Sequence, residues 1–169
     1  YIQTAAESST LERESVNGLF CMQAFHWLNR EAVRQEFLRI LKPMAKIFIA
    51  GKFLSPINEA TAQYLQITRF GKRLYGMSDN REAYTPEVME AIFGHPVKKQ
   101  TVCRESEYKT LDQLKALIQL RIDSSGDEDI KSNTGYIQEQ AERFFHQYAD
   151  SNNTVTLISE TIFYCGPLS

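Results

Sequence analysis

The chain has 169 residues, 43% of them hydrophobic and 24% charged, so it is long enough to bury a core and too apolar to be a disordered segment. Lys and Arg number 19 against 21 Asp and Glu, and the net charge of -2 argues against nucleic acid as a partner. The longest apolar run, Ile47–Ala50, is far shorter than the roughly 20 residues that cross a bilayer, so we expect no membrane segment.

Cysteine and histidine residues are few and scattered. The three cysteines, Cys21, Cys103 and Cys165, are odd in number and widely spaced, which is typical of reduced, buried thiols in a cytoplasmic protein. The three histidines form no His-x-x-x-His pair, and no Cys-x-x-Cys pair occurs. The sequence therefore predicts no metal site.

The first third of the chain has the pattern of a βαβ unit. The apolar runs Val16–Met22 and Ile47–Gly51 each predict a buried strand. Asn29 is the expected N-cap of a helix between them, whose apolar residues recur at helical spacing until Lys42-Pro43. A right-handed crossover makes the two strands parallel. We expect a further strand of this sheet at Tyr1–Thr4.

The rest of the chain alternates between predicted helices and strands. Helical periodicity from 57 to 67 predicts a helix, and the glycines at 71 and 76 predict a loop. Thr85-Pro86 begins a short helix that Gly94 ends. The later elements are a strand over 97–104, a helix after the capping box Thr110–Gln113, an acidic loop over 123–129, a helix over 137–148, a turn over 150–153 and a last strand over 154–164.

Two loops are expected where ligands bind to an open α/β sheet, beyond the carboxyl ends of its strands. Residues 5–9 follow the expected first strand, and residues 23–27 follow the second. The second loop holds Phe25, His26 and the single tryptophan, Trp27, and such a concentration of rings indicates a binding pocket. Alternatively, Trp27 packs the following helix onto the sheet and His26 makes a local hydrogen bond.

Several stretches in order resemble the class I S-adenosylmethionine-dependent methyltransferases, in particular the branch of small-molecule enzymes that includes those acting on trans-aconitate. The stretches are Ala6-Glu7, Val16–Phe20 leading into Gln23–Trp27, Arg39–Pro43, and the closing part from Tyr108 to Gly166. The resemblance covers most of the chain, and residues 55–84 match least.

The resemblance implies an α/β fold with a Rossmann-like, mostly parallel sheet of seven strands, flanked by helices and ending in an antiparallel strand pair. It implies S-adenosylmethionine as the cofactor. The cofactor-binding residues would be Ala5, Ala6, Glu7, Met22 and Gln23. The substrate-binding residues would be Phe25, His26 and Trp27, which face a small-molecule acceptor. His26 is then the candidate catalytic residue, because an imidazole can orient a hydroxyl acceptor or remove its proton.

The glycine-rich loop of that family, Gly-x-Gly-x-Gly, does not occur among the eight glycines. In the family it lies N-terminal to the position of Tyr1. We therefore expect residues 1–169 to form a single, N-terminally truncated methyltransferase domain that is inactive alone, with the activity residing in the full-length parent. The alternative is a non-catalytic fragment or degenerate relative that acts through protein association, in which a homo-oligomer covers an exposed sheet edge.

A helical cap over the acceptor is expected at about 55–95. An insertion after the strand that ends near Gly51 emerges on the ligand side of the sheet, and Gly71 and Gly76 could serve as hinges. The adjacent Lys72 and Arg73 favour an anionic acceptor.

Overall fold

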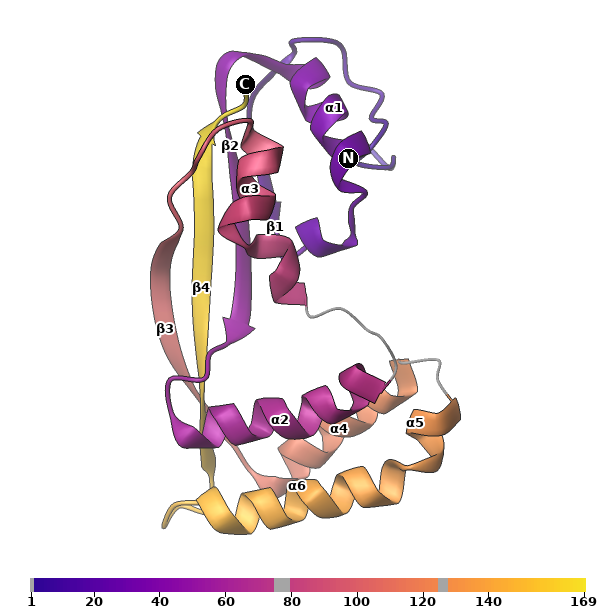
Figure 1. Ribbon diagram of the computed structural model, residues 1–169, viewed down its shortest axis with the longest axis vertical. Coiled ribbons are helices and arrows are strands. Elements are labelled where there is room, and N and C mark those ends of the chain that lie inside the picture. The colour runs from indigo at the N-terminus through magenta and orange to yellow at the C-terminus, as the bar shows by residue number, and fades with distance from the viewer. Residues whose placement is uncertain (1, 75–79, 125–127) are drawn as a thin grey trace. The chain divides into compact units, whose positions relative to one another are not determined.

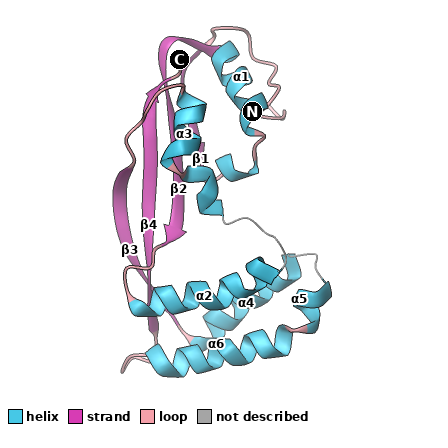
Figure 2. Cartoon of the chain, viewed as in Figure 1, coloured by secondary structure: helices cyan, strands magenta, loops and turns pink. Residues whose placement is uncertain are grey.

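A computed structural model describes residues 2–74, 80–124 and 128–169 of the chain (Figure 1). Helices and strands alternate along it, as expected for the α/β class (Figure 2). The elements are β1 (Val16–Met22), the 3₁₀ turn η1 (Phe25–Trp27), α1 (Arg30–Ile40), β2 (Leu41–Leu54), α2 (Glu59–Leu74), the 3₁₀ turn η2 (Asn80–Tyr84), α3 (Pro86–Phe93), β3 (Gln100–Lys109), α4 (Leu111–Ser124), α5 (Glu128–Ser132), α6 (Thr134–Tyr148) and β4 (Val155–Pro167).

The strands form a four-stranded sheet in the order β1-β2-β4-β3. β1 and β2 are parallel, with Phe20 opposite Phe48 and Cys21 opposite Ile49, which confirms the predicted βαβ unit. β4 runs against the direction of its neighbours β2 and β3, so the chain ends in the expected antiparallel pair (Figure 1). The complete domain implied by the resemblance has seven strands, and the described residues supply four of them.

Local sequence signals account for the two helices that cover one face of β1 and β2. The side chain of Asn29 accepts a hydrogen bond from the backbone N–H of Ala32, and this N-cap begins α1. Thr85 caps α3 through the N–H of Val88, and Gly94 ends it in the left-handed region, at φ 80°. These interactions satisfy backbone groups that a helix end leaves without partners.

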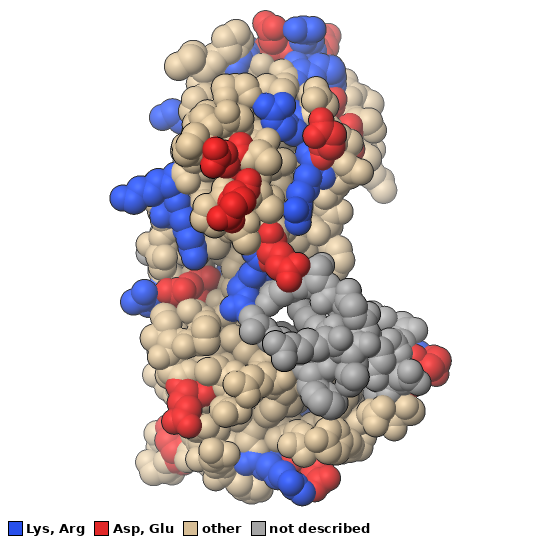
Figure 3. Space-filling model, in the orientation of Figure 1, with Lys and Arg blue, Asp and Glu red and all other residues tan. Residues whose placement is uncertain are grey.

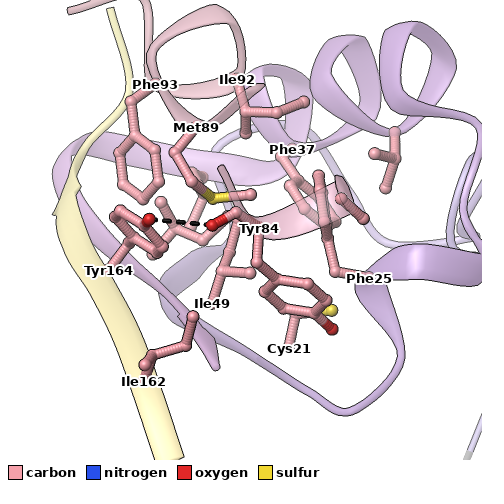
Figure 4. Close-up of a cluster of buried hydrophobic side chains, with 14 residues drawn as sticks. Cys21, Phe25, Phe37, Ile49, Tyr84, Met89, Ile92, Phe93, Ile162 and Tyr164 are labelled. Atoms are coloured by element: carbon pink, nitrogen blue, oxygen red, sulfur yellow. Dashed lines mark hydrogen bonds between the residues drawn. The ribbon is translucent and has the colours of Figure 1, made fainter. Parts of the chain in front are cut away.

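The chain divides into two compact units. The first comprises residues 1–53, 79–103 and 161–169, and its core packs α1 and α3 against the inner face of β1, β2 and β4 (Figure 4). The second comprises residues 54–78 and 104–160, and its core joins α2, α4 and α6 to the first half of β4. Residues 55–78 thus belong to the second unit and 79–95 to the first. The single domain with a cap at about 55–95 stays a prediction.

The expected strand at Tyr1–Thr4 is wrong over the residues that the structure describes. Ile2–Thr4 have no ladder hydrogen bonds, and the hydroxyl of Thr4 donates to the carbonyl of Ser8 at 3.1 Å. The segment therefore forms a local turn. Its alternation of apolar and polar residues is too short to specify a strand.

Two further boundaries differ from the prediction. β3 covers 100–109 rather than 97–104, because the exposed lysines at 98 and 99 precede the ladder instead of belonging to it. α2 continues through Gly71 to Leu74, where a loop was expected. One glycine costs a helix only about 1 kcal/mol, which the remaining helical residues can offset. Gly76 lies outside the described residues.

The described helices contain no membrane span, and one face of the molecule carries charges of both signs. None of these helices is long and apolar enough to cross a bilayer. On the face that Figure 3 shows, acidic and basic side chains are interspersed. None of the three cysteines, all of which are described, forms a disulfide, and Cys21 is buried whereas Cys103 and Cys165 are half-buried.

Candidate functional site

The predicted site begins where β1 ends, at the carboxyl edge of the parallel pair β1 and β2. Gln23 turns the chain with φ 56°, and its backbone N–H donates to the carbonyl of Ala50 at 3.0 Å. Its side-chain amide donates to the carbonyl of Lys52, also at 3.0 Å. The loop that follows β1 is thus tied to β2 by two hydrogen bonds, which fixes the start of the ring-rich segment.

The three rings of η1 have different surroundings. Phe25 is completely buried in the core of the first unit, whereas Trp27 is 77% exposed and His26 is partly buried. The packing role considered for Trp27 is therefore wrong, and Phe25 performs it instead. The structure places Phe25 among core side chains rather than on the surface where a substrate could reach it.

His26 lies between the exposed indole of Trp27 and a buried tyrosine. Its ring centroid is 4.8 Å from that of Trp27, and its Nδ1 is 3.3 Å from the hydroxyl oxygen of Tyr84. Tyr84 ends η2, and its ring reaches towards Cys21 and Phe25 (Figure 4). Tyr84 was not among the predicted site residues, because an aromatic residue before a helix cap indicates packing and gives no signal of contact with a loop 58 residues away.

Burial keeps both Tyr84 and Cys21 protonated. It raises the pKa of Tyr84 to about 12, and the neighbouring Cys21 also raises it. The nearby backbone at His26 and Phe25 lowers this pKa by a smaller amount. Burial also raises the pKa of the Cys21 thiol. A protonated, buried thiol is a poor nucleophile, so Cys21 serves packing as predicted.

The 5–9 loop comes to the same region through Glu7. Its Oε1 accepts a hydrogen bond from the backbone N–H of Asn29 at 2.9 Å, two residues after Trp27. Ala5 and Ala6 are exposed in a turn that the N–H of Ser8 closes onto the carbonyl of Ala5. The structure therefore brings together the two predicted loops, and the Glu7 carboxylate holds the start of α1.

A buried carboxylate that the sequence analysis missed anchors the same loop. Glu36 on α1 accepts hydrogen bonds from the backbone and hydroxyl of Ser9, at 2.7 and 2.6 Å, and pairs with Arg39 at 2.7 Å. Hydrogen bonds from Arg39 and then Ser9 lower the pKa of Glu36 to about 2. An acid on the inner side of a helix, three residues before an arginine, is a signal that could have revealed this pair.

Two other features of the described residues bear on ligand binding. A hollow of about 250 Å³ lies between α1 and α3, and residues such as Arg30, Arg34 and Glu87 line it, but none of the predicted site residues does. No three His, Cys, Asp or Glu side chains gather to hold a metal ion in the described part of the chain. The lack of a metal stays a prediction.

No family model matches the chain, and no curated protein matches it. Among solved structures, a protein assigned as a type II methyltransferase from Anaeromyxobacter dehalogenans matches with a TM-score of 0.52 and 15% identity, over 97% of this chain and 69% of its own. A protein assigned as a methyltransferase from Bacillus halodurans matches with a TM-score of 0.50 and 13% identity, over 98% and 69%. These similarities show that the chain has the α/β fold of those proteins.

Proposed function

We propose that the full-length parent of this chain transfers a methyl group from S-adenosylmethionine to a small-molecule acceptor. One observation carries the proposal. The turn with His26 and Trp27 follows Met22 and Gln23 at the carboxyl edge of the parallel β1–β2 pair, where α/β sheets bind ligands. The shared fold with methyltransferases supports the same conclusion at the level of architecture.

The surroundings of this edge fit one side of the cofactor. Met22 is 65% exposed, so its thioether can contact an apolar or aromatic part of a ligand. Ala5 and Ala6 are exposed and small, which lets a flat ring approach the backbone. Glu7 contributes by holding the loop at Asn29. Bound there, S-adenosylmethionine supplies an electrophilic methyl group on a sulfonium.

The protein's part in the reaction is alignment. If S-adenosylmethionine is bound there, the acceptor's lone pair would form the new bond to the methyl carbon while the carbon–sulfur bond breaks. The two electrons of the broken bond would stay on sulfur, and S-adenosylhomocysteine would be released. Holding the three atoms in line supplies much of the acceleration. His26 orients the acceptor oxygen or, for a hydroxyl, takes its proton, and Trp27 offers an exposed ring face to the acceptor or the sulfonium.

We also propose that the acceptor is anionic and that the segment near 55–95 selects it. Lys72 and Arg73 support this proposal by their charge, although their side chains lie outside the described residues. Replacing residues 55–84 with the segment of a methyltransferase of different specificity should change acceptor preference. An unchanged preference would argue against the cap.

The proposed activity can be tested with S-adenosylmethionine carrying a labelled methyl group. The full-length parent is incubated with a panel of carboxylates, phosphates and neutral hydroxyl compounds of similar size, and labelled product and S-adenosylhomocysteine are both counted. We expect equal amounts of the two with an anionic compound. If no compound of any class led to the release of S-adenosylhomocysteine, the proposal would be contradicted.

A second function, association between copies of this chain, is favoured by the outer face of β1. This strand forms one edge of the described sheet. Phe20 is 78% exposed there and stacks on Phe48 of β2, with ring centroids 4.5 Å apart. Val16–Met22 contains no charged residue to discourage edge pairing. Such a surface suits a homo-oligomer, whether the chain is catalytic or not.

A further inference from the structure

We propose that the hollow between α1 and α3 binds a free α-amino acid with an aliphatic side chain. The hollow has a volume of about 250 Å³ and lies within the first unit. Ligand pockets commonly measure roughly 300–1,000 Å³, so this hollow suits a small molecule. None of the residues predicted to bind the cofactor or the acceptor lines it, so the proposal does not depend on methyl transfer.

Two arginines supply positive charge on the side of the hollow that α1 forms. Arg30 and Arg34 are four residues apart, so they lie on one face of the helix, and both line the hollow. Arg30 is the first residue of α1, where the helix dipole disfavours a cation, and the like charge of Arg34 disfavours it further. Its side chain has no hydrogen-bond or ion-pair partner among the residues that the structure describes. An anion bound in the hollow would offset both unfavourable interactions.

Arg34 is held in position by the backbone at and beyond the end of α3. Its Nε donates to the carbonyl of Ile92 at 3.0 Å, and its Nη2 donates to the backbone oxygen of Ser169 at 2.5 Å. A guanidinium has five N–H groups, so these two bonds leave both N–H groups of Nη1 for a ligand. A carboxylate can therefore bind to a guanidinium that is already ordered, which reduces the entropy lost on binding.

Acidic side chains balance the charge of the two arginines. Glu31 of α1 and Glu87 of α3 also line the hollow, and within the described ranges neither forms an ion pair with Arg30 or Arg34. A simple carboxylate would be repelled by the two acids, and a simple amine would be repelled by the two arginines. A zwitterion fits both, because its carboxylate can face the arginines while its ammonium group faces the acids.

The wall that α3 contributes is largely apolar. Val88 is followed three and four residues later by Ala91 and Ile92, so the three side chains lie on one face of the helix and line the hollow. Ile92 is 2% exposed, Val88 is half-buried and Ala91 is exposed. Burial of a short aliphatic side chain against this wall is favourable. Leucine combines such a side chain with the two charges that the rest of the hollow requires.

Calorimetric titration of the full-length parent with leucine tests the proposal. The matched ligands are isocaproate, which is leucine without its ammonium group, and isoamylamine, which is leucine without its carboxylate. We expect leucine to bind with a dissociation constant on the order of 1 mM or below, and each matched ligand to bind about fivefold more weakly or worse. Absence of leucine binding would overturn the proposal, and so would equal binding of either matched ligand.

Arg30→Gln and Glu87→Gln test whether leucine binds in this hollow. Each removes the charge of an exposed side chain, so the fold should be kept, which thermal melting verifies. We expect each variant to bind leucine about threefold more weakly or worse. Arg13→Gln is the control and should bind leucine as the wild type does, because Arg13 is an exposed arginine of the first unit that does not line the hollow. Unchanged affinity in either folded variant would overturn the proposal.

Discussion

Three consecutive rings have three different roles because η1 is a 3₁₀ turn. Successive side chains in such a turn point about a third of a turn apart. Phe25 therefore enters the core, Trp27 faces solvent, and His26 lies between them, within reach of Tyr84. The composition of this segment indicated a binding loop, but the division of its rings between core and surface depends on a backbone conformation that residue types do not specify.

His26→Ala tests the role of this residue in the full-length parent. If His26 orients or deprotonates the acceptor, loss of its imidazole should lower the methyl-transfer rate by on the order of 10²-fold, while the affinity for S-adenosylmethionine stays nearly constant. Steady-state kinetics and thermal melting on one preparation separate this effect from instability. His146→Ala, an exposed histidine on α6, is the control and should change neither. A stable His26→Ala protein with normal turnover would exclude the role.

Glu36→Gln tests the anchor of the 5–9 loop. Glu36 is buried and bonded to Ser9 and Arg39, so removing its charge should lower the free energy of unfolding by about 1–3 kcal/mol. Glu31→Gln changes an exposed acid on the same helix and should have little effect. Urea unfolding of both variants provides the comparison, and equal stabilities would show that the Glu36 pair contributes nothing.

The same pair predicts a pH dependence. The pKa of Glu36 is about 2 in the folded protein, below its ordinary value near 4.5, so between these values the unfolded chain binds more protons. Stability from this group is therefore present above pH 4.5 and is lost as the pH falls towards 2. Urea unfolding measures the free energy of unfolding at pH 6 and at pH 3. The difference between these two values should be smaller for Glu36→Gln than for the wild type. An identical difference would contradict the assignment.

At the scale of elements, patterns with a local physical cause were predictable. Caps at Asn29 and Thr85, the stop at Gly94 and the capping box at Thr110 each depend on residues within one turn, and the structure confirms the three helices that they define. Pairing in a ladder depends on residues far away in sequence. This is why the expected strand at Tyr1–Thr4 is wrong and β3 is displaced.

A pair of glycines tests the helix ends. Gly94 has φ 80°, and a Cβ there would overlap the backbone oxygen of Ser169. Gly94→Ala should therefore lower the free energy of unfolding by about 1–2 kcal/mol or more. Gly135 lies in the first turn of α6 with nothing within 4 Å of an added Cβ. Gly135→Ala should instead stabilise by about 0.5–1 kcal/mol. Chemical denaturation checks both, and the same sign for the two changes would refute this explanation.

At the scale of the whole molecule, the sequence predicted the α/β class but not the division into two units. That division depends on α2, α4 and α6 sharing a core, and the contacts between these helices join residues such as Tyr64 and Phe144 that lie 80 positions apart. The site was predictable in part. The loop at 23–27 follows from strand order, because it comes directly after β1. The loop at 5–9 follows no strand, and like Tyr84 and Glu36 it reaches this region through tertiary contacts.

The exposed outer face of β1 predicts self-association of residues 1–169. Phe20→Asp places a charge on this face and should shift sedimentation velocity towards the monomer. Ile57→Asp, which also replaces an exposed apolar residue but lies in the second unit, should leave the distribution unchanged. A wild-type chain that stays monomeric at high concentration would exclude association through β1.

We propose that the carboxyl edge of β1 binds S-adenosylmethionine in the full-length parent. Calorimetric titration with S-adenosylhomocysteine tests it on the wild type, Met22→Asp and Met44→Asp, because the two methionines are 65% and 83% exposed and lie at opposite ends of the β1–β2 pair. We expect the wild type and Met44→Asp to bind alike, and Met22→Asp to bind at least tenfold more weakly. Absence of binding to the wild type, or equal affinity in all three proteins, would contradict it.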